Sequence, residues 1–112
     1  MLSRLENALD REERLRRVRT YLAALGLRHY RAIVFGSVGR GDFVAESDTD
    51  LLVVSDELPE EPRARIDRLF DLRHLAPEIE PVGWREAEWR RREAEGDPFL
   101  ERLKREGLQV AP

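Results

Sequence analysis

The sequence contains no cysteine, which excludes disulfides, thiolate metal sites and cysteine nucleophiles. It also lacks any run of about 18 apolar residues, so we expect no segment that spans a membrane. The N-terminal residues 1–6 are charged and have no apolar stretch of the kind found in secretory signal peptides. These absences lead us to expect a cytoplasmic protein.

Positive charge is not in excess, because 20 Lys and Arg residues face 23 Asp and Glu residues, giving a net charge of −3. Proteins that hold long nucleic acids by neutralising phosphates normally carry a clear positive excess. The run 90–92 consists of three arginines, but glutamates surround it and form helical i,i+4 pairs with it. We therefore interpret this run as a solvated helix face and do not expect extended nucleic-acid binding.

The sequence lacks the motifs on which several common kinds of site depend. There is no Gly-Lys-Ser or Gly-Lys-Thr, so the chain is not a P-loop protein. Ser37 does not stand in a Gly-x-Ser-x-Gly frame, which argues against a hydrolase nucleophile. His29 and His74 lie far apart without the spacing of paired ligands, so zinc is not expected.

The apolar residues suit a single small core. They make up 41% of 112 residues, and no repeat or linker divides the chain, so we expect one domain over residues 1–112. Asp10 followed by Glu13 has the form of a capping box, which predicts a helix from there to Gly26. The buried side of this helix is predicted from its apolar spacing: Leu15, Val18, Leu22 and Leu25.

The remaining pattern alternates strands with helices. Strands are predicted over 30–35, 50–55 and 78–82, the last at a sheet edge because Pro81 cannot donate to a ladder, with a short strand over 108–110. Helices are predicted over 60–75, 85–95 and 97–107. The apolar side of the first of these helices comprises Ile66, Leu69, Phe70 and Leu72. The expected class is α/β (α+β), a small mixed sheet flanked by helices.

Two short motifs carry candidate chemistry. Gly36-Ser37 directly follows a predicted strand, where glycine permits a tight turn and the following amides favour an anion. Asp48-Thr49-Asp50 stands at the head of an apolar strand, and residues i and i+2 point to the same face, roughly 7 Å apart. Two such carboxylates suit magnesium, which takes one or two carboxylates and fills its octahedron with water and phosphate oxygens. Each motif alone is more often a plain turn or a solvated strand entrance.

The combination is more specific than either motif. Gly36-Ser37-Val38-Gly39-Arg40-Gly41, followed by Ser47-Asp48-Thr49-Asp50-Leu51-Leu52-Val53, resembles the minimal nucleotidyltransferases of the DNA-polymerase-β-like superfamily. The resemblance extends more loosely to Gly96-Asp97-Pro98-Phe99 and Glu106-Gly107. It implies the polymerase-β-like nucleotidyltransferase fold and a transfer of nucleoside monophosphate that depends on magnesium ions.

The resemblance also implies roles for individual residues. Gly36 and Ser37 would hold the triphosphate, and Asp48 and Asp50 would bind magnesium. Arg40 falls on the motif arginine, and would contact phosphate or brace the loop by an ion pair.

The family has a third acidic residue on a later strand, which binds metal and helps to deprotonate the attacking hydroxyl. Glu80 is our first candidate for it and Glu78 our second. The sequence departs from the family pattern at Val38 and Gly39, where Arg and Ala are common, and in having Glu followed by Pro81 at the third acid.

The resemblance implies a nucleoside triphosphate substrate, with ATP favoured, and a hydroxyl acceptor. We expect no residues to be left over for an acceptor-binding domain. Minimal nucleotidyltransferases commonly occur together with a helical HEPN-type toxin, for which they act as the antitoxin. We therefore expect such a protein as partner and acceptor. The alternative is a catalytically weak or inactive binding module with the same fold. A nucleotide-sugar glycosyltransferase would also use Asp-x-Asp, but the chain is short for one.

Overall fold

The computed structural model describes residues 4–111, with the backbone alone at positions 4, 5, 7, 9 and 111. The helices are α1 (Arg4–Leu25), α2 (Gly36–Arg40), α3 (Pro62–Phe70), α4 (Glu86–Ala94) and α5 (Pro98–Glu106), with a 3-10 turn, η1, at Arg73–Leu75. The strands are β1 (Arg31–Phe35), β2 (Thr49–Val54), β3 (Ile79–Trp84) and β4 (Leu108–Ala111). The order of elements matches the order predicted from the sequence.

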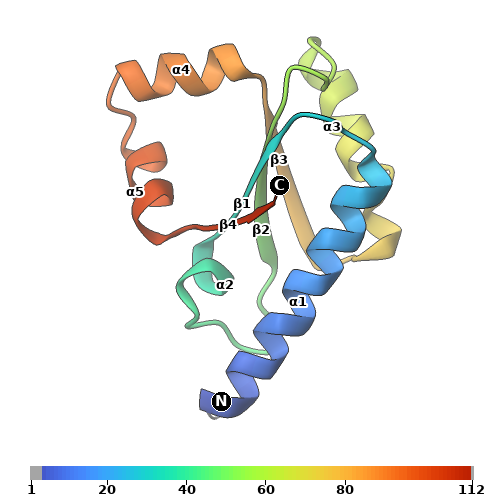
Figure 1. Ribbon diagram of the computed structural model, residues 1–112, viewed down its shortest axis with the longest axis vertical. Coiled ribbons are helices and arrows are strands. Elements are labelled where there is room, and N and C mark those ends of the chain that lie inside the picture. Colours follow the sequence, from blue (N-terminus) through green and yellow to red (C-terminus); the bar gives the residue numbers. More distant parts are fainter. Residues whose placement is uncertain (1–3, 112) are drawn as a thin grey trace.

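The four strands form one mixed sheet in the order β3-β2-β1-β4. β1 pairs antiparallel with β2 and with β4, whereas β2 pairs parallel with β3. Figure 1 shows α1 and α3 on one face of the sheet and α4 and α5 on the other. The expected α+β fold, a small mixed sheet flanked by helices, is confirmed.

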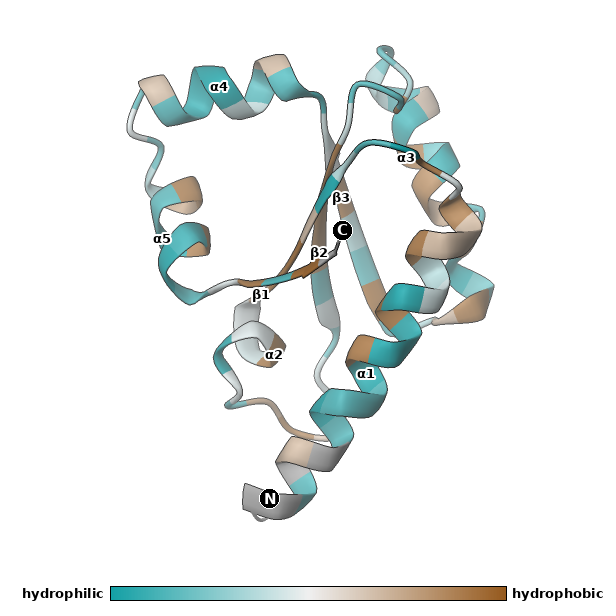
Figure 2. Ribbon diagram, in the orientation of Figure 1, coloured by the Kyte–Doolittle hydropathy of each residue, from teal (hydrophilic) through white to brown (hydrophobic). Residues whose placement is uncertain are grey.

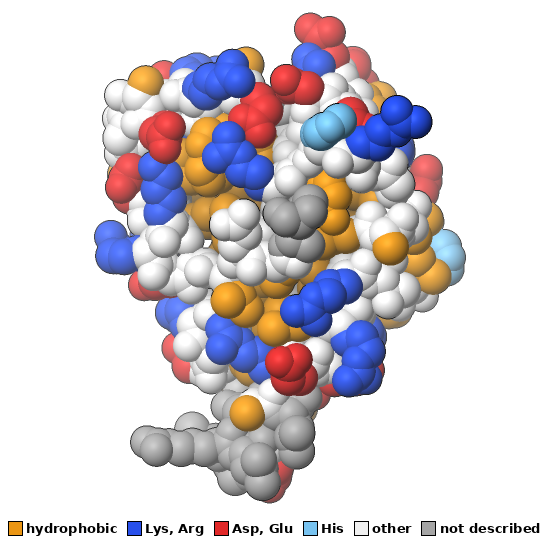
Figure 3. Space-filling view, in the orientation of Figure 1, with side chains coloured by type: hydrophobic (Ala, Val, Ile, Leu, Met, Phe, Trp, Pro, Cys, Tyr) orange, Lys and Arg blue, Asp and Glu red, His pale blue; other side chains and the backbone are white. Residues whose placement is uncertain are grey.

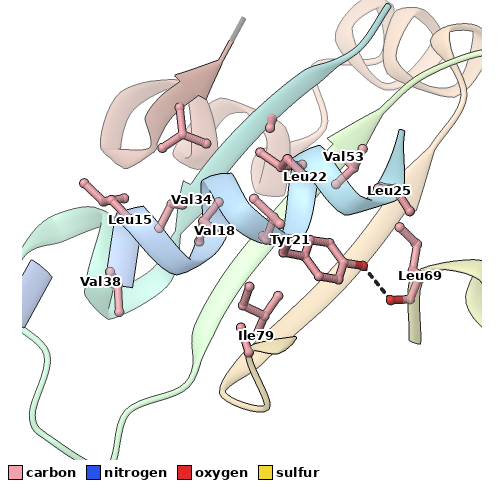
Figure 4. Packing of buried hydrophobic residues seen from close by; sticks show 14 of the residues in the cluster. Leu15, Val18, Tyr21, Leu22, Leu25, Val34, Val38, Val53, Leu69 and Ile79 are labelled. Carbon is pink, nitrogen blue, oxygen red and sulfur yellow. Dashed lines mark hydrogen bonds between the residues drawn. The ribbon is translucent and has the colours of Figure 1, made fainter. Parts of the chain in front are cut away.

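The larger core lies between α1 and the sheet. α1 contributes Leu15, Val18, Tyr21, Leu22 and Leu25 to this core, and the strands contribute Val34, Val53 and Ile79 (Figure 4). Tyr21 is fully buried, and its hydroxyl donates to the Leu69 carbonyl of α3 at 2.5 Å. Burial raises the pKa of Tyr21 to about 12. This bond ties the two helices of that face together.

A second core covers the opposite face under α4 and α5. Its buried members are Leu52, Val54, Trp84, Trp89, Leu100 and Leu103. Aromatic rings meet here edge to face, as in the pair Phe35–Phe99, whose centroids lie 5.4 Å apart. In Figure 2 the brown, hydrophobic segments of α5 face the sheet, as an amphipathic pattern requires.

Two local predictions were wrong. α1 begins at Arg4 and not at Asp10. Asp10 lies inside the helix, where its carboxylate accepts a hydrogen bond from Arg14 at 3.1 Å instead of capping the helix start. The helix expected over 60–75 ends at Phe70, after starting where the Glu61 side chain caps the amides of residues 63 and 64.

The apolar side predicted for that helix is only partly buried. Leu69 is buried, whereas Ile66 is 52% exposed and Phe70 38% exposed. Both line a groove with Pro81 and Val82 of β3. The physical reason is that β3 is the last strand on this side of the sheet, so no further strand lies beside it to cover them.

β3 is an edge strand, as Pro81 predicts. In a parallel pair, the backbone groups of every second residue point toward the neighbouring strand. The carbonyls of Trp84 and of Glu78, which directly precedes β3, point toward β2 and accept from the amides of Ser55 and Thr49. The carbonyl of Ile79 instead accepts from Arg73 at 2.9 Å, and that of Gly83 accepts from Arg65 at 3.3 Å. Arginine side chains therefore occupy this edge.

The surface is charged in both signs. Figure 3 shows Lys and Arg side chains interspersed with Asp and Glu over one face of the molecule. Among the described residues, no helix is both long and apolar enough to cross a bilayer.

Candidate active site

The two motifs meet at one end of the sheet. β1 runs into the Gly36 turn, and β2 begins immediately after Asp48. Because the two strands are antiparallel neighbours, the end of one lies beside the start of the other, and Phe35 pairs with Asp50. The fold therefore brings together segments that are ten residues apart in the sequence.

Gly36 is required by the carboxylate beside it. Its φ of 68° lies in the left-handed region that glycine adopts without strain. A Cβ atom at this position would overlap the Oδ2 atom of Asp50. Gly36 therefore leaves open the space into which the Asp50 carboxylate points.

Asp50 lies at the centre of an acidic group. In the parallel register of β2 and β3, Asp50 pairs with Glu80, and Asp48 lies two residues earlier on the same chain segment. Partial burial raises the pKa of Asp50, and the negative charges of Asp48 and Glu80 raise it further. Among the described residues, no hydrogen bond or ion pair holds the Asp50 carboxylate, which leaves it available to a bound cation.

The two candidates for the third acid differ in position. Glu80 is a β3 residue, and its Oε1 accepts from Arg73 at 3.0 Å. Glu78 was expected to share a strand with it, but β3 begins at Ile79. The Glu78 carboxylate accepts from Arg17 of α1 at 2.5 Å.

Arg40 is bound by neighbouring carboxylates. Its Nε donates to Asp42 at 3.1 Å, and its Nη1 lies 3.7 Å from a Glu106 oxygen. The hydrogen bond to Asp42 is the main cause that raises the Arg40 pKa. The side chain of Arg40 also lines the cavity beside Gly36 and Asp50.

The turn itself is tightly packed. Val38 is fully buried, so this position faces the core rather than a ligand. A Cβ atom on Gly39 would lie 2.7 Å from the Val34 carbonyl oxygen, so the alanine common in the family would require a shift here. The Ser37 carbonyl accepts from the amides of Gly41 and Asp42 and closes the turn.

A cavity of about 180 Å³ opens beside Gly36 and Asp50. It is lined by Phe35, Gly36, Arg40, Asp50, Phe99, Arg102 and Glu106. Sequence reasoning missed Arg102 as a site residue, and the only signal near it was the loose resemblance around Phe99. Among the described residues, Arg102 has no carboxylate partner, unlike Arg40.

The donor set fits a hard divalent cation. Asp48, Asp50 and Glu80 would supply carboxylate oxygens, which magnesium prefers over nitrogen or sulfur. Within residues 4–111, no three or more His, Asp or Glu side chains are already close enough to hold a metal ion. Glu80 is bound to Arg73 instead.

Comparison with known proteins identifies the family of the chain. No curated protein and no solved structure matched the chain. A family model described as nucleotidyltransferase domain matches residues 15–106, which include both motifs, Glu80 and the cavity residues on α5. Such a domain implies a nucleotide substrate, and its family typically uses divalent metal ions. The chain therefore belongs to the nucleotidyltransferase domain family.

Proposed function

We propose that the protein transfers a nucleoside monophosphate, AMP from ATP in the favoured case, to a hydroxyl acceptor in a magnesium-dependent reaction. The chain, residues 1–112, acts as one domain. The observation that carries this proposal is the Asp50 carboxylate, which has a raised pKa, faces the space left by Gly36 and lies beside Glu80. A structural aspartate would be expected to have a partner that relieves its charge.

Each group of residues has a distinct task in this proposal. The Gly36–Ser37 turn and its amides receive the triphosphate, while Asp48, Asp50 and Glu80 hold magnesium. Bound magnesium neutralises phosphate charge and stabilises the charge that develops on the leaving group. The protein otherwise contributes positioning, because phosphoryl transfer requires alignment more than covalent help.

The bond changes define what Glu80 does. The acceptor oxygen forms a bond to the α-phosphorus, the bond from that phosphorus to the bridging oxygen breaks, and pyrophosphate leaves. The acceptor proton passes to the Glu80 carboxylate. Arg73 already orients that carboxylate through one of its two oxygens.

We further propose that the acceptor lies on a protein partner, a helical HEPN-type toxin, in line with an antitoxin role. The supporting observation is a groove of about 590 Å³ between α3 and the edge of β3. Its exposed apolar side chains include Ile66, Phe70 and Val82. Contiguous exposed apolar side chains commonly mark a protein interface.

The same groove favours a second candidate function, a binding module that needs no turnover. The two functions differ in what they require of the carboxylates. A binder tolerates the loss of Asp48 and Asp50, whereas a transferase does not. Incubation of the partner with radiolabelled ATP, using wild type and the double variant, separates label transfer from simple complex formation.

The first test is calorimetric titration of ATP into the protein with and without magnesium. We expect magnesium-dependent binding that is lost in Asp48→Asn/Asp50→Asn and retained in Asp71→Asn, a matched change at an exposed aspartate that is not a member of the site. Absence of binding by wild type, with GTP, CTP and UTP also silent, would refute the nucleotide site.

A further inference from the structure

Two arginines of α1, Arg11 and Arg14, reach across to the two motif segments. Arg14 is 4% exposed and is the only charged side chain that is buried among those described. Arg11 lies one helical turn earlier on the same helix. Neither residue belongs to the motifs that define the candidate site.

Arg14 binds the loop that leads into Asp48. Its guanidinium donates to the carbonyls of Ser47 at 2.5 Å and Ala45 at 2.9 Å, and to the Thr49 hydroxyl at 3.1 Å. A longer bond of 3.4 Å reaches the Val44 carbonyl. Arg14 thereby contacts the residues on both sides of Asp48 in the chain.

The partners of Arg14 are mostly uncharged. Asp10 supplies one carboxylate oxygen at 3.1 Å and is itself 35% exposed, and the Phe43 ring lies 4.9 Å from the guanidinium carbon. Burying a cation is unfavourable unless its donors are satisfied, and a planar guanidinium can satisfy several acceptors in fixed directions. Position 14 therefore requires a planar guanidinium group with several donors, and a positive charge alone would not suffice.

Arg11 makes the corresponding contacts with the other segment. Its Nε donates to the Val38 carbonyl at 3.1 Å, and its Nη2 donates to the Gly39 carbonyl at 2.6 Å. Both carbonyls belong to α2, which follows the Gly36 turn. α1 thus contacts both segments through two neighbouring guanidinium groups. Arg11 contacts the Gly36 turn, and Arg14 contacts the loop that leads into Asp48.

We propose that Arg14, together with Arg11, is a positioning residue that fixes the Asp48–Asp50 segment relative to the Gly36 turn. This inference rests on the proposed function, because the alignment matters for a nucleotide whose phosphates meet both segments. A displacement of about 1 Å at a phosphoryl-transfer site is enough to lower activity strongly. Neither arginine touches the reacting atoms in this proposal.

The test compares Arg14→Lys with Arg16→Lys in the full chain. Arg16 lies on the same helix but is exposed, and the one ion pair it makes with a described residue is to Glu13. In Arg14→Lys we expect amide hydrogen exchange at residues 43–48 to rise by about tenfold, with the amides of β2 and β3 unchanged. We also expect magnesium–ATP binding to weaken by about tenfold, and metal-free ATP binding to stay within about twofold.

The outcomes separate this inference from the proposed function. Wild type that binds no magnesium–ATP refutes the nucleotide site, while the hydrogen-exchange result still decides whether Arg14 orders the loop. Uniform loss of protection across β2 and β3 would mean that Arg14 only stabilises the fold, which overturns the inference. Exchange and affinity equal to those of Arg16→Lys overturn it as well. If Arg14→Lys does not fold, Arg11→Lys is measured at residues 36–41 by the same criteria.

Discussion

Asp50 of β2 and Glu80 of β3 are direct partners in the parallel register of the sheet. Their carboxylates, with that of Asp48, gather negative charge beside a space that Gly36 keeps open. Partial burial and this charge together raise the Asp50 pKa. The arrangement is unfavourable for the protein alone and becomes favourable when a cation is bound.

The first prediction concerns stability without metal. Asp50→Asn should raise the Tm of the metal-free protein by about 1–4 °C at pH 7, because it removes a charge that folding penalises. Since the folded pKa is raised, the penalty is present at pH values above it. The penalty disappears as the pH falls below the unfolded value of about 3.9. The advantage of Asn should therefore shrink between pH 7 and pH 4.

Magnesium should reverse the order of the two proteins. Saturating magnesium and ATP stabilise only the protein that binds them, so wild type should gain Tm while Asp50→Asn should not. Thermal scans by circular dichroism at several pH values measure both effects. Equal Tm values for the two metal-free proteins at every pH would contradict the electrostatic account of Asp50.

The second prediction distinguishes the two glutamates. Glu80→Gln should lower the rate of nucleotide transfer by about 10²–10⁴-fold, because both a proton acceptor at the reacting hydroxyl and a magnesium ligand are lost. Glu78→Gln should leave the rate within about threefold, because Glu78 lies before β3 and pairs with Arg17 of α1, whereas Glu80 is the register partner of Asp50. Single-turnover assays with labelled ATP measure the rate, and the opposite ranking would assign the role to Glu78.

The third prediction concerns the cavity beside Asp50. Arg102 lines it and has no carboxylate partner among the described residues, and we expect Arg102→Gln to weaken ATP binding by about 3–10-fold through loss of a phosphate contact. Arg105→Gln is the matched control, because Arg105 lies on the same helix outside the cavity lining. Calorimetry at low and moderate salt measures both, and equal affinities for the two variants would exclude Arg102 from the site.

The fourth prediction concerns the core. Tyr21→Phe should lower the free energy of unfolding by about 1–3 kcal/mol, because the buried Leu69 carbonyl loses its donor. In wild type, burial disfavours the charged phenolate of Tyr21 and so raises its pKa to about 12. The resulting stability is present below the unfolded pKa of about 10 and is lost as the pH rises toward 12. Urea denaturation between pH 7 and 11 should show this loss in wild type and not in the variant.

The sequence predicted the strands and the order of elements because apolar runs and turn residues are local signals. It placed β1, β2 and the edge strand β3 within one or two residues of their observed bounds. It failed at the start of α1 and at the exposed face of α3. Whether Ile66 and Phe70 are covered depends on which strand lies at the sheet edge, and this is a property of the whole fold.

The two motifs could be identified from the sequence, but the side chains that hold the two motif segments in place could not. Gly36 and Asp50 stand out by spacing, and the structure places them together. Arg14 is one of many arginines in a charged helix, and nothing local distinguishes it from Arg16. Its role depends on a contact 33 residues away in the chain, which no periodic pattern indicates.

The outward carbonyls of β3 bear on how this molecule can associate. Because Arg65 and Arg73 already occupy the carbonyls of Gly83 and Ile79, and Pro81 offers no amide, an incoming strand finds few backbone groups to pair with. Sheet extension across two copies is therefore disfavoured at this edge. A protein that docks here has to do so through side chains, which makes recognition depend on shape rather than on generic strand addition.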